Sequence, residues 1–166
     1  MRTKFFISVF LLTGALSAFS QAPYKNSIGG IVGFIEGGSY KTFISDNFAI
    51  QVDLGFRWSH YAAGVEVNGN FMYEQAIKNG FHWLAGGGLS TGPAFGGILF
   101  NPLTNTVPIG FKIGMNGIGG AEYKFKNIPL TLQADIRPGA SFYIFNGGFN
   151  AYFDYNFVNA SARYTF

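Results

Sequence analysis

Few side chains in this sequence could carry out acid–base or nucleophilic chemistry. The chain has two histidines and no cysteine, which excludes a thiolate metal site, a cysteine nucleophile and a disulfide scaffold. Ser59 and His60 are adjacent and Glu66 follows them, but a hydrolytic triad also needs its three groups to converge in space. His60 and His82 are isolated and provide no metal-ligand spacing. We therefore predict no catalytic residue and no metal site.

Two glycine-rich runs, at 86–88 and 117–120, could in principle cradle a phosphate. A phosphate-binding loop places its backbone N–H groups at the start of a helix, and no helical pattern follows either run. Glycines inside strands more often permit bends and close backbone packing. We therefore predict that the protein has no cofactor.

The composition is unusual for a soluble domain. Charged residues make up 11% of the 166 residues and aromatic residues 19%, whereas an average domain is about 25% charged. So many aromatic residues exclude a disordered chain, and the length fits a single domain. The sequence pI of about 9.2 would suggest a nucleic-acid partner if the basic residues belonged to the folded domain.

Residues 1–22 have the layout of a secretory signal peptide. Arg2 and Lys4 precede an apolar run, and small residues up to Ala22 fit a signal-peptidase site. Its removal would leave a single domain at 23–166 with 9 basic and 8 acidic residues. We therefore expect an exported protein, and a nucleic-acid partner is excluded because little net positive charge remains.

Beyond the signal, apolar and polar side chains alternate with a period of two. In 48–58, 130–136 and 158–166, the even positions are apolar and most odd positions are polar. Successive side chains of a strand point to opposite faces, so each of these segments has one apolar and one polar face. No uninterrupted apolar run is long enough for a transmembrane helix.

Eight such segments and their connections predict the fold. We place the strands near 26–36, 39–45, 47–58, 61–74, 81–91, 109–125, 128–143 and 151–166. Short turns are expected at 45–47, 75–79 and 126–127, and longer or glycine-rich connections around 37–38, 59–60, 92–108 and 144–150. Short turns at one end and long loops at the other are typical of outer-membrane barrels. The prediction is an all-β, eight-stranded, antiparallel up-and-down transmembrane β-barrel.

The positions of the aromatic residues favour a membrane barrel over a soluble one. A lipocalin-like barrel would show the same alternation with its apolar face inside. Here the aromatics cluster near the strand ends and flank a band of aliphatic residues and glycine, as in the interfacial girdles of membrane barrels. Those near the short turns are Phe48, Phe71, Tyr73, Phe81, Trp83, Tyr123, Phe125, Tyr164 and Phe166. Those at the other end are Phe56, Trp58, Tyr61, Phe111 and Phe142.

The polar side chains would then face the lumen. Acidic and basic residues occur there in similar number, as expected if paired charges fill the narrow interior of an eight-stranded barrel. A structural network is the main interpretation, and a proton or solute path through the same residues is the alternative. The predicted lumen residues are Gln51, Asp53, Arg57, Glu66, Lys112, Glu122, Lys124, Gln133, Asp135, Arg137 and Arg163.

Motifs near the C-terminus resemble one known family. The chain reads GGAEYKFKNIPL at 119–130, DIRP at 135–138 and ARYTF at 162–166. These segments resemble the small outer-membrane β-barrel proteins of Gram-negative bacteria. The resemblance implies a barrel in the outer membrane and a C-terminal insertion signal, Tyr164 and Phe166, that the outer-membrane assembly machinery reads. It implies little about activity, because many members have none assigned.

The predicted loop at 92–108 is the most suggestive feature outside the strands. Its apolar residues could contact a partner, admit a hydrophobic ligand or fold over the barrel mouth. The residues concerned are Phe95, Ile98, Leu99, Phe100 and Leu103.

Together these observations predict a monomeric barrel, surrounded by outer-membrane lipid, with a plugged lumen. Its expected role is structural or one of surface interaction, without catalysis, and the sequence names no extracellular partner. Two alternatives remain. One is a narrow channel or carrier for small hydrophobic solutes, and the other, because His60 lies at an outer strand end, is a lipid A-modifying enzyme.

Overall fold

The computed structural model describes residues 22–58, 62–96, 109–145, 148–155 and 158–166. No helix in this part of the chain is long and apolar enough to cross a membrane. The signal peptide expected at 1–22 lies almost wholly outside these residues and stays a prediction. The strands are β1 (Asn26–Gly33), β2 (Ile35–Phe43), β3 (Phe48–Trp58), β4 (Ala62–Lys78), β5 (Phe81–Gly96), β6 (Ile109–Lys124), β7 (Leu130–Ile136), β8 (Gly139–Phe145), β9 (Gly148–Asp154) and β10 (Asn159–Thr165).

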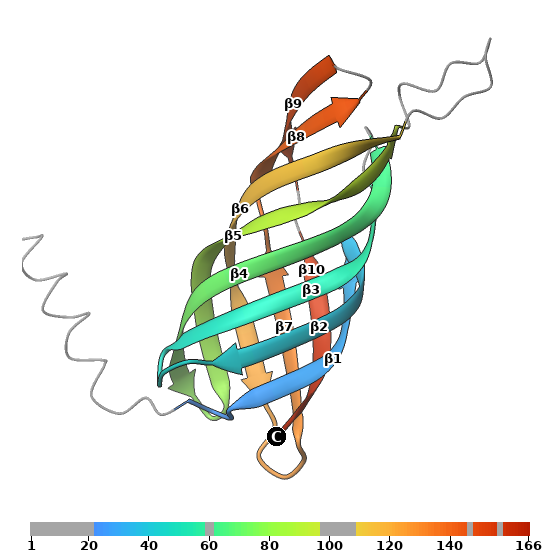
Figure 1. The fold of residues 1–166 in the computed structure, drawn as a ribbon. Coiled ribbons are helices and arrows are strands. Elements are labelled where there is room, and N and C mark those ends of the chain that lie inside the picture. The colour runs from blue at the N-terminus through green and yellow to red at the C-terminus, as the bar shows by residue number, and fades with distance from the viewer. Residues whose placement is uncertain (1–21, 59–61, 97–108, 146–147, 156–157) are drawn as a thin grey trace, which may run out of the picture.

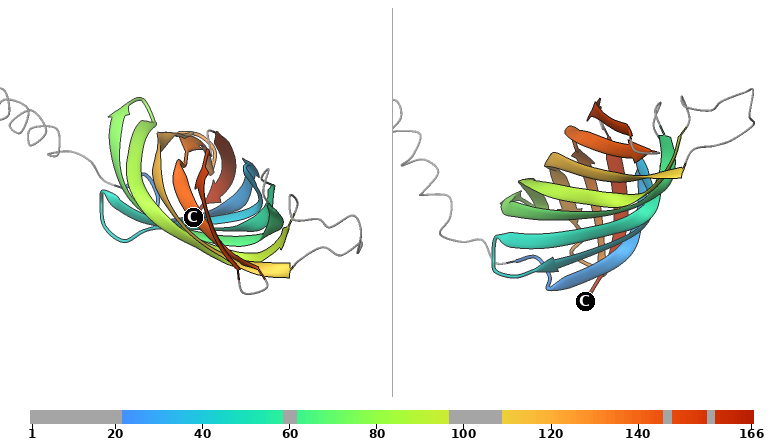
Figure 2. Two further views of the ribbon diagram at one scale, coloured as in Figure 1. Left: turned by 90° about the horizontal axis from the view of Figure 1, so that it is seen from above. Right: turned by 45° about the horizontal axis from the view of Figure 1, so that its top comes forward.

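These strands close into one antiparallel barrel (Figure 1). β7 and β8 both pair with β6, whereas β10 pairs with β7 and β9 with β8. Each of the couples β7–β8 and β9–β10 therefore occupies one position in the wall, and β1 pairs with β10 to complete the ring. The predicted eight-stranded, antiparallel up-and-down β-barrel is confirmed. From above, the strands curve around a common axis (Figure 2).

Two of the eight wall positions are interrupted. Pro138 lies between β7 and β8 and has no N–H to donate to a ladder, although its carbonyl accepts a 2.9 Å hydrogen bond from the Gly117 N–H. The other interruption separates β9 from β10, and the inward parity differs between these two strands. Inward positions are even-numbered before the break, as for Asp154, and odd-numbered after it, as for Arg163.

The first hairpin turns earlier than predicted. It turns at Gly33 and Phe34, and not around Gly37 and Gly38. Gly33 has φ 131°, a conformation that favours glycine. Gly37 lies inside β2, where a Cβ atom would come within 2.2 Å of the Leu54 carbonyl oxygen. Gly37 therefore allows close strand packing, and the Gly37–Gly38 pair makes no turn.

β5 extends beyond the point at which a loop was predicted. It continues through Pro93 to Gly96, with Pro93 opposite Phe111 of β6. The ladder with β4 is interrupted at Pro93, so no pairing on that side depends on its missing N–H. The predicted loop therefore shortens to 97–108, and Phe95 is an outward-facing strand residue that is 41% exposed.

The connections differ less between the two ends than the sequence predicted. We call the end with the C-terminus the inner end and the opposite end the outer end. The strands leave connections of 44–47, 79–80 and 125–129 at the inner end and of 34, 59–61, 97–108 and 146–147 at the outer end. Only the connection at 97–108 is long, so the predicted asymmetry rests on that segment alone.

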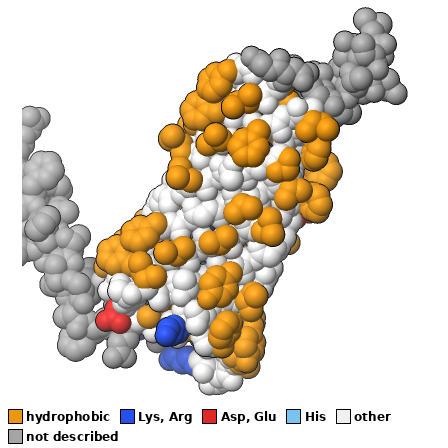
Figure 3. All heavy atoms as spheres, in the orientation of Figure 1, with side chains coloured by type: hydrophobic (Ala, Val, Ile, Leu, Met, Phe, Trp, Pro, Cys, Tyr) orange, Lys and Arg blue, Asp and Glu red, His pale blue; other side chains and the backbone are white. Residues whose placement is uncertain are grey.

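The barrel wall is apolar outside and polar inside. Hydrophobic side chains are distributed over the height of the visible outer face, with backbone and other side chains between them (Figure 3), and Leu89, midway along β5, is 68% exposed. Within the described ranges, the exposed charged side chains lie only in turns or near strand ends. They are Lys25, Glu36, Asp46, Lys78 and Lys126.

Aromatic rings line much of the inner rim. The ring centroids are 5.4 Å apart for Phe48–Phe71, 5.5 Å for Tyr73–Trp83, 4.6 Å for Phe81–Tyr123 and 6.4 Å for Tyr164–Phe166. At the outer end Trp58 is 65% exposed, and Phe142 stacks on Phe149 at 5.6 Å. The predicted Tyr61 lies outside the described residues. Rings at both ends therefore flank a mainly aliphatic band.

Candidate functional site: a filled polar lumen

The barrel interior holds three clusters of charged side chains. They contain five cations and six carboxylates, brought together from strands that are distant in the sequence. We define the inner cluster as Lys41, Glu74, Glu122 and Arg163; the middle cluster as Asp53, Asp135 and Arg137; and the outer cluster as Arg57, Glu66, Lys112 and Asp154. Paired charges can persist in a dry interior, whereas single ones are costly.

The inner cluster is fully buried and centres on Glu122. One oxygen, Oε2, accepts hydrogen bonds from Lys41 Nζ at 2.9 Å and from Arg163 Nη2 at 2.8 Å. Lys41 also pairs with Glu74. Two cations and two carboxylates therefore balance each other at this level of the lumen.

Tyr24, just before β1, closes the inner mouth next to this cluster. Its hydroxyl donates a 2.7 Å hydrogen bond to Glu122 Oε1, and its ring packs edge-on against Phe43 at 5.2 Å. Burial, and then the charge of Glu122, raise the pKa of Tyr24 well above its usual value. The phenol therefore stays protonated and remains a donor.

Loss of the Tyr24 hydroxyl should weaken this seal. We expect Tyr24→Phe to lower the free energy of unfolding by about 1–2 kcal/mol, because Glu122 Oε1 then loses its donor. Denaturant unfolding in detergent measures this change. Tyr40→Phe is the matched control, since the Tyr40 hydroxyl makes an exposed 3.0 Å bond to Asn26. Equal losses in the two variants would contradict a sealing role for Tyr24.

In the middle cluster, one arginine is held between two aspartates. Arg137 Nη1 lies 2.6 Å from Asp53 Oδ2, and Nε lies 2.7 Å from Asp135 Oδ1. The second carboxylate is also supported by the Gln133 side-chain amide, which donates to Asp135 Oδ2 at 2.7 Å. Gln51 donates to Asp53 in the same way. These amide donors offset the excess of negative charge.

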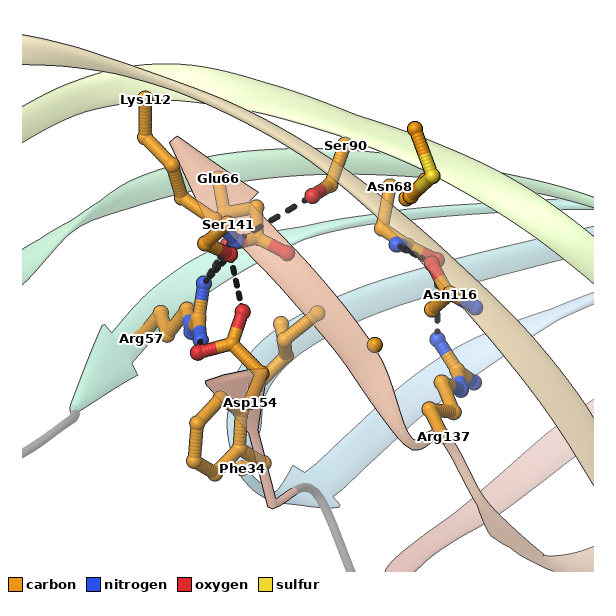
Figure 4. A pocket seen from close by; sticks show the side chains of 13 residues that line it. Phe34, Arg57, Glu66, Asn68, Ser90, Lys112, Asn116, Arg137, Ser141 and Asp154 are labelled. Carbon is orange, nitrogen blue, oxygen red and sulfur yellow. Dashed lines mark hydrogen bonds and ion pairs between the residues drawn. The ribbon is translucent and has the colours of Figure 1, made fainter. Parts of the chain in front are cut away.

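The outer cluster lies around a small cavity (Figure 4). Arg57 reaches Glu66 at 3.0 Å and Asp154 at 2.5 Å, and Lys112 also pairs with Glu66. The cavity offers about 20 Å³ to the centre of a water-sized sphere, which is room for about one water molecule. A larger solute has no place in it.

Apolar side chains close the lumen at both ends. Near the inner end, Tyr24 packs against a buried cluster of Phe43, Ala49, Met72, Leu84 and Ile118. Near the outer end, the buried cluster is Ala62, Ala94, Tyr143 and Phe145. The charged clusters are therefore shielded from water at each end.

Most of the predicted lumen residues lie in these clusters. Gln51, Asp53, Arg57, Glu66, Lys112, Glu122, Gln133, Asp135, Arg137 and Arg163 are all buried. Lys124 does not join them. Its ammonium donates to the carbonyls of Phe125 and Ile128 at the inner rim, because β6 ends there and the side chain reaches the following turn.

Four residues of the site were missed from the sequence. Glu74 has the same parity as Glu66 on β4 and lies at the end of the predicted strand 61–74, so the alternation could have indicated it. Lys41 follows glycines that blur the pattern of β2, and Asp154 lies before the parity shift. Tyr24 precedes every predicted strand, so no periodic signal indicated it.

The other singled-out residues belong to none of the three clusters. Tyr164 and Phe166 lie at the inner rim and are 56% and 60% exposed. His82 is 6% exposed and its Nδ1 has no hydrogen-bond partner among the described residues. Ser59, His60, Ile98, Leu99, Phe100 and Leu103 lie outside those residues.

The outer cluster also contacts a serine. Ser90 Oγ accepts a 3.1 Å hydrogen bond from Lys112 Nζ, and Lys112 is also paired with Glu66. Where the chain is described, no group of His, Cys, Asp and Glu could hold a metal ion. Comparisons with protein-family models, characterised proteins and solved structures give no match.

Proposed function

We propose that the protein is an integral outer-membrane β-barrel with a plugged polar lumen and a structural or surface-interaction role, without catalysis. One observation carries the placement: the outer wall is apolar and exposed between two aromatic rims, while eight ion pairs lie inside. In water this arrangement would expose the apolar groups and bury the charged ones. In a bilayer it is the favourable arrangement.

The size of the apolar wall supports a lipid environment. Soluble monomers rarely expose a contiguous apolar patch larger than a few hundred Å². Here outward side chains such as Val52, Leu89 and Met115 are 41–68% exposed on separate strands around the ring. A partner protein would have to surround the barrel to cover them all, whereas lipid covers them without a specific contact.

The resemblance of the C-terminal motifs to small outer-membrane barrels supports the same placement. Tyr164 and Phe166 point outward at the inner rim, where they would meet the assembly machinery in the periplasm. Phe166 also helps to close the ring between β1 and β10, since the Phe166 and Asn26 backbones exchange two 2.9 Å hydrogen bonds. An insertion signal and a closing strand would thus be the same segment.

Two measurements test the placement. The protein should fractionate with the outer membrane, and an unboiled sample should migrate differently from a boiled one on an SDS gel because the closed barrel resists unfolding. A soluble protein without this shift would contradict the proposal. Unchanged acyl patterns of lipid A in deletion cells are expected, and an altered pattern would favour a lipid A-modifying enzyme.

The plugged lumen predicts that the protein does not conduct ions. Tyr24 and the apolar clusters close both ends, and the outer cavity holds about one water molecule. Planar-bilayer recordings of the purified protein should therefore show no discrete single-channel steps. A large porin in the same bilayer is the positive control. Reproducible steps from this protein would instead support the channel alternative.

A further inference from the structure

β9 forms an open strand edge in an otherwise closed barrel. Among the described strands it alone pairs on one side only, with β8. The other side of β9 faces the place that a longer β1 would occupy, but β1 ends at Gly33. The β8–β9 hairpin therefore stands above this part of the rim (Figure 1).

The open edge follows from the stagger of the barrel. Closing a tilted sheet requires the strands to shift in register around the ring. Gly33 of β1 therefore meets Asn159 of β10, well below Gly148 at the tip of β9. The first hairpin is too short to compensate, because β2 begins at Ile35.

Every second residue of β9 presents its backbone to this open edge. Phe145 pairs with Gly148 across a two-residue connection, and the pair that flanks such a turn is hydrogen-bonded. The even-numbered residues of β9 therefore bond to β8. Phe149, Ala151 and Phe153 direct their N–H and C=O groups away from it.

The edge lacks the features that usually prevent strand pairing. Exposed edges are commonly protected by lysine, proline or a bulge, and 148–154 contains no lysine, arginine or proline. Its single charge, Asp154, is paired with Arg57 at 2.5 Å. Phe149 and Phe153 are 67% and 56% exposed beside the open edge.

We propose that the β9 edge binds an extended segment of another polypeptide by antiparallel strand addition, with apolar or aromatic side chains of that segment against Phe149 and Phe153. This inference rests on the proposed membrane placement, which argues against a second copy. Two antiparallel strands are related by a two-fold axis perpendicular to their sheet. Because that sheet is the barrel wall, such an axis would invert the second barrel relative to the membrane.

A peptide with the β9 sequence, GFNAYFD, is a suitable probe because it needs no orientation in a membrane. Aligned antiparallel about Ala151, it places a phenylalanine opposite Phe149 and another opposite Phe153, and its glycine opposite Asp154. Aromatic cross-strand pairs of this kind stabilise sheets. The peptide is capped at both ends, labelled, and titrated against the detergent-solubilised barrel by fluorescence anisotropy.

The decisive comparison is between peptide N–H groups that would face β9 and those that would point away from it. N-methylation of the peptide's central alanine, whose N–H would face β9, should weaken binding about tenfold. N-methylation of the neighbouring tyrosine, whose N–H points away, should leave binding unchanged. On the protein, Ala151→Pro should also weaken binding about tenfold without disturbing the β8–β9 ladder, and Ala151→Val, which keeps the N–H, is the matched control.

Several results would overturn the proposal. These are a Kd weaker than about 1 mM, equal binding of a scrambled peptide, or equal affinity of wild type and Ala151→Pro. A detergent dimer that Ala151→Pro abolishes would show a second copy to be the occupant and would also overturn it. Heat-modifiability gels verify that each variant folds. Because binding is measured in detergent, failure of the edge is distinguishable from failure of membrane placement.

Discussion

Replacing Arg137 by methionine should lower the free energy of unfolding by about 3–5 kcal/mol, the cost of leaving a buried charge without its partner. Arg137 is 2% exposed and is the only cation bonded to Asp53 or Asp135 among the described residues. Its loss leaves two buried carboxylates that repel each other. Methionine fills much of the space, so the measured loss reports charge more than volume.

The triple variant Asp53→Asn, Asp135→Asn, Arg137→Met provides the comparison. It removes all three charges together, so we expect it to recover most of the stability lost in Arg137→Met. Urea unfolding in detergent, followed by tryptophan fluorescence, measures both variants. Lys126→Met, in an exposed turn, is the control and should change stability by less than about 0.5 kcal/mol. A triple variant as unstable as Arg137→Met would show that the charges are not a coupled network.

Placing an arginine at Leu89 should destabilise the protein by about 2–4 kcal/mol in a phospholipid bilayer. Leu89 lies midway along β5 and points outward, 68% exposed. In the proposed placement this position is near the middle of the hydrocarbon layer, where a guanidinium loses its hydration. In a water-soluble barrel the same substitution would exchange an exposed apolar group for a charge, with little cost.

The control is the same substitution at a position near the membrane surface. Ile77, at the inner end of β4, is also exposed, at 64%, but lies beside the rim residue Lys78. Ile77→Arg should cost only about 0–1 kcal/mol, as expected near the interface. Reversible unfolding of both variants from lipid vesicles gives the two values. Equal and small effects would argue against the membrane placement while leaving the barrel fold intact.

Local alternation predicted the strands well because it reflects the pleat of the backbone. Phe48 to Trp58 and Leu130 to Ile136 follow the period of two, and both are strands with the predicted inward faces. The prediction was wrong where glycine and proline have more than one use. Gly37 serves strand packing and not a turn, and Pro93 lies inside β5 at an interruption of one ladder.

In the lumen, too, neighbouring residues along a strand predicted only part of the arrangement. The parity of Glu66, Arg137 and Arg163 placed their side chains in the interior, but it could not pair them. Arg137 pairs with Asp135, its near neighbour in the sequence, and also with Asp53 from across the barrel. Asp154 joins Arg57 because the inward positions of β9 are even-numbered, whereas those of β10 are odd-numbered.

Local patterns in the sequence were therefore enough to predict the β class, the eight wall positions and the separation of an apolar face from a polar one, because each depends on neighbours along one strand. Which charges meet, how Tyr24 seals the inner mouth and where the ring leaves an edge open are settled only when the barrel closes. These features depend on the stagger with which distant strands close the barrel. No local pattern encodes that stagger, since it is a property of the closed ring.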